Sequence, residues 1–252
     1  MNINYPMPLQ LLGLRALWKS AFDDTDSFLD KFFSTAFSPN RCRCVSLGGK
    51  VLAALYWFET TCQDRKFAYL YAVATDAACR NQGLCRRLIE DTKALLRAEG
   101  YAGILRVPED EALTRMYAKM GFEPCTTVSE CWITPGPELA TIHRIDKETY
   151  ALCRRDLLPK GAVVQEGENL SFLDSQYQFY SGTSCLAAVA LEGEKLYCHE
   201  LLGHPDDAPK ILRTLGASLG FFRFPGDGKP FAMLCPLCED CPKPSYFGLA
   251  FD

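Results

Sequence analysis

The turn from Arg80 to Arg87 combines positive charge with a small, flexible backbone. Arg80, Gly83 and Cys85 give the spacing Arg-x-x-Gly-x-small, and two further arginines follow them. An apolar segment, residues 67–75, precedes the turn and leucines at helical spacing follow it, so the predicted order is strand, turn and helix. The first backbone N–H groups of a helix are unpaired and lie at the positive end of its dipole, where they bind phosphate. The sequence therefore predicts a polyanion site, which would also offset the unfavourable effect of arginines at a helix start.

A second group of residues suited to chemistry lies downstream, in residues 113–122. The segment reads Leu-x-x-Met-Tyr-Ala-Lys-Met-Gly-Phe and places Tyr117 on a predicted helix. A tyrosine hydroxyl within hydrogen-bond reach of a leaving group can protonate it as a general acid. The alternative is that Tyr117 only packs, with its hydroxyl bonded to a neighbouring group.

Together, the two motifs, in this order and with one strand between them, resemble the GNAT superfamily of N-acyltransferases. In that family the first motif binds the acyl-CoA pyrophosphate, and the second is a helix that carries a tyrosine near the reacting thioester. The resemblance implies that Tyr117 is the general acid. Cys85 stands where the family usually has Gly or Ala, although a free cysteine packs as a small residue. Asp110 stands where related proteins often carry Asn.

The resemblance also implies that acetyl-CoA is the acyl donor. The backbone at the end of the apolar strand would bind the amides of the pantetheine arm, and the turn would bind the pyrophosphate. The cofactor-binding residues predicted in this way are Val73, Ala74, Thr75, Arg80, Asn81, Gln82, Gly83, Leu84, Cys85 and Arg86. No family motif identifies the general base, for which Glu59, Asp76, Glu109 and a water chain are candidates.

Hydrophobic patterning predicts an α/β fold for the first half of the chain. The expected elements are helices over residues 8–22 and from Asp26, strands over 42–47, 50–59 and 67–75, a helix ending at Gly100, a strand over 104–107, and a helix that Pro108 opens and Gly121 closes. A tight hairpin at Gly48 and Gly49 joins the first two strands.

The second half repeats this order of elements. Pro135, Gly136 and Pro137 indicate a linker. Strands are expected over 170–173, 185–191 and 195–202, a helix over 208–219, and strands over 221–224 and 231–237. We therefore predict two GNAT-like domains, residues 1–130 and 131–252, each a mixed, mostly antiparallel central sheet flanked by helices, the second degenerate. Some GNAT proteins are similar in being tandem.

The turn of the second half differs in charge from the turn of the first. It carries Asp206 and Asp207 before the predicted helix and has no Arg-x-x-Gly. Carboxylates at that place satisfy the helix dipole themselves and repel phosphate. We therefore expect one CoA per chain, bound by the first half, with the second half used for packing or for the acceptor.

The composition is that of a globular protein, because 48% of its 252 residues are hydrophobic and 23% are charged. A net charge of −4 argues against nucleic acid as a partner, since binding to phosphate backbones needs clustered Lys and Arg. The longest apolar runs, residues 51–58 and 67–74, are too short to span a bilayer, and the start lacks the features of a signal peptide. We expect a cytoplasmic protein with no membrane partner and with reduced thiols.

Three of the thirteen cysteines, Cys235, Cys238 and Cys241, have the close spacing of zinc or iron–sulfur ligands. A fourth ligand is missing nearby and prolines surround the segment, so packing thiols are favoured and no metal is predicted.

The function that these features predict is the transfer of an acetyl group from acetyl-CoA to a primary amine of a small molecule or peptide. One alternative is a non-catalytic acyl-CoA-binding sensor or regulatory module, in which the loop persists without a base. Another is a metal-dependent redox protein built on the three cysteines. The acceptor, the acyl chain and the oligomeric state are left open.

Overall fold

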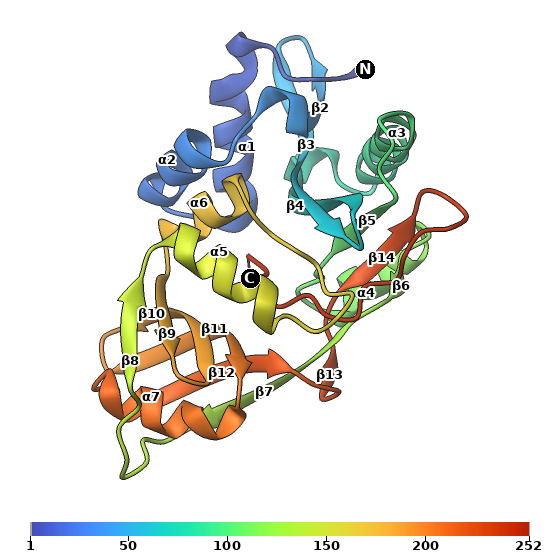
Figure 1. Ribbon diagram of the computed structural model, residues 1–252. Helices are drawn as coiled ribbons and strands as arrows, with labels where there is room; N and C mark the ends of the chain where they lie inside the picture. The colour runs from blue at the N-terminus through green and yellow to red at the C-terminus, as the bar shows by residue number, and fades with distance from the viewer. Residues whose placement is uncertain (1, 252) are drawn as a thin grey trace. The chain divides into compact units, whose positions relative to one another are not determined.

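A computed structural model gives the structure of the protein and describes residues 2–251 (Figure 1). The residues group into two compact units. The first contains the chain up to Glu123 together with Met233–Pro242, and the second contains Pro124–Ala232 together with the residues from Lys243 onward. Each unit holds a seven-stranded sheet and helices, which confirms the predicted α/β class. Within residues 2–251, none of the helices is long and apolar enough to cross a membrane.

The first sheet has the strand order β1-β2-β3-β4-β5-β14-β6. Its strands are β1 (Asn2–Asn4), β2 (Cys42–Leu47), β3 (Lys50–Cys62), β4 (Arg65–Thr75), β5 (Gly103–Arg106), β14 (Met233–Pro236) and β6 (Glu123–Pro124). Strands β1 to β4 are joined by antiparallel pairs, and β14 is antiparallel to β5. Strands β4 and β5 are parallel, so the chain crosses between them through α3 (Leu84–Ala98).

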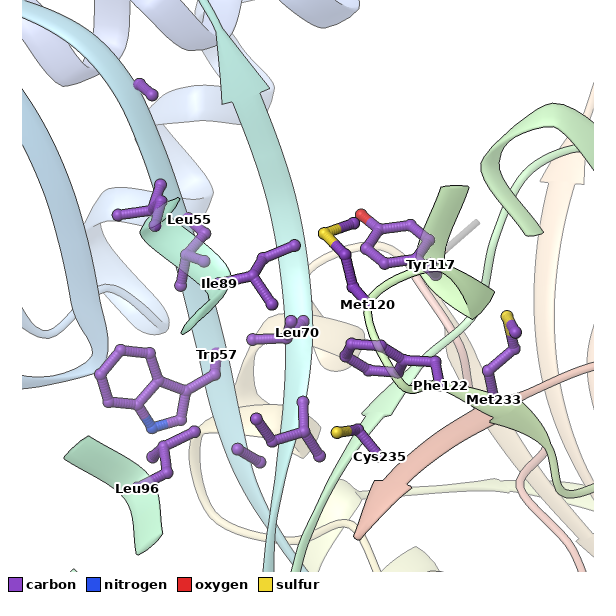
Figure 2. Packing of buried hydrophobic residues seen from close by; sticks show 14 of the residues in the cluster. Leu55, Trp57, Leu70, Ile89, Leu96, Tyr117, Met120, Phe122, Met233 and Cys235 are labelled. Carbon is purple, nitrogen blue, oxygen red and sulfur yellow. The ribbon is translucent and has the colours of Figure 1, made fainter. Parts of the chain in front are cut away.

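Helices cover both faces of this sheet. On one face, α1 (Leu11–Phe22) and α2 (Asp26–Thr35) place Trp18 and Phe32 against tyrosines of β3 and β4, with the Trp18 and Tyr56 ring centroids 5.0 Å apart. On the other face, α3 packs on Trp57 and Leu70, as Figure 2 shows. The residues of β3 alternate between these two cores, as a strand buried on both sides requires.

Strand β4 parts from β5 after three residue pairs, the last of which joins Tyr69 to Leu105. Just beyond this point a bulge shifts the register between β3 and β4, and Ala72 adopts a φ of 45°. Non-glycine residues rarely occupy this left-handed region, and bulges bend a strand and redirect its side chains. The end of β4 therefore runs on with one edge that no strand of the sheet covers.

The helix expected from Pro108 begins later than predicted. Helix α4 spans Glu111–Ala118, and its N-cap is Asp110, whose carboxylate accepts a hydrogen bond from the Leu113 N–H at 2.7 Å. An aspartate cap satisfies one of the free N–H groups of the first turn, which proline cannot do. Asp110 is thus a capping residue of the helix that carries Tyr117.

The second sheet has the strand order β13-β7-β12-β11-β10-β9-β8. Its strands are β7 (Thr127–Ile133), β8 (Ile142–Ile145), β9 (Gln178–Gly182), β10 (Cys185–Glu192), β11 (Lys195–Gly203), β12 (Leu219–Pro225) and β13 (Lys229–Pro230), and its helices are α5 (Lys147–Leu157), α6 (Glu168–Asp174) and α7 (Ala208–Thr214). Strands β11 and β12 are parallel and are connected through α7, as β4 and β5 are through α3. As β3 and β4 do in the first sheet, β10 and β11 shift register, and His199 is the extra residue of β11 at this bulge.

Two segments of the second half differ from the prediction. Residues 170–173 were expected as a strand but lie within helix α6, and β9 takes the strand position instead. Periodicity alone does not separate helix from strand in so short an apolar run. The strand expected over 231–237 forms β14, which pairs with β5 in the first sheet. Strand β7 in turn belongs to the second sheet, so a single boundary after residue 130 would cut it.

A buried ion pair lies in the second unit beside the extra residue of β11. Arg154 of α5 donates hydrogen bonds from Nε and Nη2 to the two carboxylate oxygens of Glu200, at 2.6 and 3.0 Å. Tyr150 donates a third at 2.9 Å. The side chains of Arg154 and Glu200 are 2% and 0% exposed, so water cannot take the place of either partner if the other is removed.

Glu200→Gln should therefore destabilise the second unit by about 3 kcal/mol, because it leaves the buried Arg154 without a counter-charge. The measurement is denaturant-induced unfolding followed by circular dichroism. The matched control is Glu166→Gln, which breaks an exposed pair with Arg155 and should change the unfolding midpoint little. Equal midpoints for the two variants would contradict the prediction.

Candidate active site

A cavity of about 480 Å³ lies in the first unit. It is lined by the end of α1, the end of β4, the turn before α3, the start of α3, the end of β5 and helix α4. The predicted site residues that line it are Val73, Ala74, Thr75, Arg80, Asn81, Gly83, Leu84, Cys85, Arg86 and Tyr117. Gln82 does not line it, because its exposed side-chain amide turns back to donate a hydrogen bond to the Ala78 carbonyl at 3.3 Å.

The start of α3 is open toward this cavity. Its N-cap is Gly83, with φ 76°, a residue without a side chain that could accept a hydrogen bond from the N–H groups of the first turn. The left-handed backbone favours glycine here. A Cβ at Gly83 would meet no atom within 4 Å, so there is open space beside this residue of the turn. Such a space, faced by free N–H groups, suits a phosphate group.

Two of the three predicted arginines surround this helix start. Arg80 is exposed and donates a hydrogen bond from Nε to the Thr75 carbonyl at 3.3 Å. Arg86 is also exposed and donates from Nη1 to the Lys119 carbonyl at 3.3 Å. Arg87 does not line the cavity, but Lys119, which the sequence reasoning missed, does. These cations are exposed, so an anion from the solvent can reach them.

Tyr117 lies on α4 and is 1% exposed. Its ring makes an edge contact with Phe122, with the centroids 5.4 Å apart, in the group of residues that Figure 2 shows. Burial raises the pKa of the Tyr117 hydroxyl, and the nearby Arg106 guanidinium opposes that rise only in part. The phenol therefore holds its proton at neutral pH, as a general acid must.

Arg106 is a residue of the cavity that the sequence reasoning missed. It is the last residue of β5, and its Cζ lies 5.6 Å from the centroid of the Tyr117 ring. Its Nη1 donates a hydrogen bond to the Leu70 carbonyl at 3.2 Å, beyond the last pair between β4 and β5. The only signal in the sequence is a charged residue inside an otherwise apolar strand.

The three carboxylates considered as general bases occupy different places. Glu59 accepts a hydrogen bond from the Tyr101 hydroxyl at 2.8 Å and does not line the cavity. Asp76 forms an ion pair with Lys50 at 2.5 Å, which lowers the pKa of its carboxyl, and it also lies outside the lining. Glu109 is exposed and lines the cavity.

The three closely spaced cysteines do not form a cluster. Cys235 pairs with Ile104 in the first sheet, and Cys238 accepts a hydrogen bond from Arg65 at 3.4 Å. In the part of the chain that the structure describes, no group of three or more Cys, His, Asp and Glu side chains could hold a metal ion. The cysteines are free thiols.

Comparison with known families identifies the first unit. The sequence profile of the acetyltransferase (GNAT) family matches residues 11–122. This range begins with α1 and ends at Phe122, which follows the helix of Tyr117 and its closing glycine, Gly121. The first unit is a GNAT acetyltransferase domain. No curated protein matches the sequence.

Solved structures share the fold of the whole chain at low sequence identity. A GCN5-related N-acetyltransferase from Anabaena variabilis has a TM-score of 0.75 and 11% identity, over 94% of this chain and 73% of that chain. One from Kribbella flavida has a TM-score of 0.70 and 14% identity, over 92% and 70%. Eis1 from Mycobacterium abscessus has a TM-score of 0.67 and 10% identity, over 94% and 74%. The chain therefore consists of two GNAT-like domains, as predicted, with the arginine turn in the first.

Proposed function

We propose that the first unit transfers an acetyl group from acetyl-CoA to a primary amine of a small molecule or peptide. The observation that carries this proposal is the open start of α3, with exposed arginines, in the same cavity as a protonated tyrosine. Acetyl-CoA requires two functions from its site. Its pyrophosphate needs an anion site, and its departing thiolate needs a proton donor. We also propose a cytosolic location, where free thiols stay reduced.

The proposed position of the donor follows the lining of the cavity. The pyrophosphate lies against the first N–H groups of α3, in front of Gly83, with Arg80 and Arg86 beside it. The pantetheine arm follows Val73–Thr75, along the edge of β4 that β5 leaves uncovered. The thioester then lies next to Tyr117, where α4 meets the gap between the two strands.

The reaction forms a bond between the amine nitrogen and the acetyl carbon and breaks the carbon–sulfur bond of the thioester. The thiolate leaves with a proton from the Tyr117 hydroxyl, which the raised pKa keeps protonated. The proton lost by the amine passes to a base, for which Glu109 is the candidate that lines the cavity. Tyr117 then regains its proton through water.

The test is turnover of acetyl-CoA, followed as released thiol, with a panel of amines that includes polyamines, aminoglycosides, amino acids and short peptides. Acetylation of at least one amine, seen by mass spectrometry, is expected. Calorimetric binding of acetyl-CoA without turnover of any amine would favour the acyl-CoA-binding sensor instead.

Gly83→Asp should weaken the binding of acetyl-CoA at least about tenfold, or 1.4 kcal/mol. The new side chain places a negative charge in the space in front of the helix start and strains a left-handed backbone position. Calorimetry on the folded variant measures the change in Kd. The control is Gly100→Asp at the other end of α3, with φ 80° and open space around it, which should bind as the wild type does. An unchanged Kd in Gly83→Asp would exclude the turn as the phosphate site.

Tyr117→Phe should lower kcat while leaving the affinity for acetyl-CoA nearly intact, because a proton donated to the leaving thiolate stabilises the transition state alone. Steady-state kinetics and calorimetry on the same preparation measure both quantities. Because the pKa of Tyr117 is raised above its ordinary value near ~10, kcat of the wild type should show no loss from tyrosine ionisation between pH 7 and about 9.5. A variant with the wild-type kcat would leave Tyr117 with a packing role.

One molecule of CoA should bind per chain. The helix that corresponds to α3 in the second unit is α7, which has seven residues and follows Asp206 and Asp207. Asp207 accepts a hydrogen bond from the Ser184 hydroxyl at 2.6 Å. These carboxylates repel phosphate where the first unit presents arginines. Calorimetric titration with acetyl-CoA measures the stoichiometry, and two equivalent sites would contradict the assignment.

A further inference from the structure

Arg106 differs from the other cations of the cavity, which are exposed, because its side chain is half-buried against the Tyr117 ring. Its Nε is buried and has no hydrogen-bond partner within residues 2–251. Its Nη1 has the Leu70 carbonyl, and the groups that influence its charge most are the hydroxyls of Tyr117, Tyr69 and Tyr71. Among the described residues, no carboxylate forms an ion pair with it. The guanidinium is therefore a half-buried charge whose described neighbours are dipoles and one aromatic ring.

Such an arrangement is unfavourable in a folded protein unless something compensates it. Moving a charge out of water costs free energy that neutral hydrogen bonds only partly restore. Arg106 stays charged, since an arginine keeps its proton in a protein. Burial lowers the pKa of its guanidinium, but the tyrosines around it more than offset this effect. A site that keeps an unpaired guanidinium beside a cavity is prepared for an anion that comes from outside the chain.

The charges along the cavity also favour an anion. Its lining includes four cations, Arg80, Arg86, Arg106 and Lys119, and one carboxylate, Glu109. Glu109 is exposed and forms no ion pair with Arg106 within the described chain. A cavity in which charges of one sign predominate raises the local concentration of ligands of the opposite sign.

We infer that Arg106 binds a carboxylate of the substrates, so that either the acyl group or the amine acceptor is acidic. This inference rests on the proposed acyl transfer, because it takes Tyr117 as the residue next to the thioester; an acidic acyl group would take the place of the acetyl group in that proposal. Arg80 and Arg86 are exposed at the helix start and serve the pyrophosphate, whereas Arg106 lies against the Tyr117 ring. A carboxylate there belongs to the end of the donor that reacts or to the acceptor beside it. The planar fork of a guanidinium matches the two oxygens of a carboxylate.

The two sources are separated by two sets of matched compounds. In the donor set, calorimetry compares malonyl-CoA with butyryl-CoA and succinyl-CoA with valeryl-CoA, pairs of similar size that differ in the terminal carboxylate. In the acceptor set, kcat/KM with acetyl-CoA compares amino acids with their carboxamides and lysine with cadaverine. The wild type should prefer the carboxylate member at least tenfold in one of the two sets.

Variants then assign that preference to Arg106. Arg106→Gln should reduce the preference to less than threefold, and Arg106→Lys, which keeps the charge but not the fork, should give an intermediate value. The control is Arg115→Gln on the same helix as Tyr117, since Arg115 is exposed, pairs with Glu111 and does not line the cavity. It should keep the wild-type preference.

Each outcome decides between the hypotheses. No preference for a carboxylate in either set with the wild type would overturn the inference, and so would a preference that Arg106→Gln leaves unchanged. The wild-type comparison holds even where Arg106→Gln does not fold, and Arg106→Lys then supplies the assignment. Failure of every acyl-CoA to bind to the wild type would instead overturn the proposed function, so the two failures are distinguishable.

Discussion

The site depends on one constraint, which is that β4 and β5 run parallel and stay paired for only three residues. A parallel pair needs a crossover, and here α3 supplies it, so that the helix starts near the end of β4. The bulge at Ala72 lets β4 continue away from β5, and the backbone edge that results lines the cavity. Gly83, at the proposed phosphate site, and Tyr117, the proposed proton donor, are therefore brought to one cavity by the path of two strands.

The strand ends also explain why the cavity contains a charge. Arg106 is the last residue of β5, so its side chain begins where the pairing to β4 has stopped. Its Nη1 donates a hydrogen bond to the carbonyl of Leu70, the residue of β4 that follows the last pair with β5. The guanidinium takes part of the space that the two strands leave, and the Tyr117 ring packs against it. A neutral side chain would fill this space at a lower cost, which is the physical reason for assigning Arg106 a ligand.

The second unit keeps the same topology without the same site. Its parallel pair, β11 and β12, is also connected by a helix, and β11 carries an extra residue at His199. The neighbouring Glu200, however, is held by the buried Arg154, and the turn before α7 is acidic. The buried charges of Arg154 and Glu200 are thus paired with each other within the second unit. The comparison separates the fold, which both units share, from the site, which depends on particular residues.

The sequence by itself determined the features that depend on residues close together in the chain. The strand, turn and helix around Gly83, the hairpin at Gly48 and Gly49, and the place of Tyr117 on a helix follow from spacing and backbone preference within about ten residues. The order of elements in the first half was predicted for the same reason. The start of α4 was the exception there, because the cap at Asp110 competes with the proline before it.

Only the tertiary structure decided which distant segments meet. The residues of β14 lie in the chain between the two segments of the second unit yet pair with β5, and residues 170–173 are helical while β9 forms the strand. Arg106 could not be recognised from sequence, since one charge in a short apolar strand has meaning only when no carboxylate of the described residues pairs with it. Pairing across long separations and the burial of a single charge depend on where the whole chain folds, and local spacing carries no record of them.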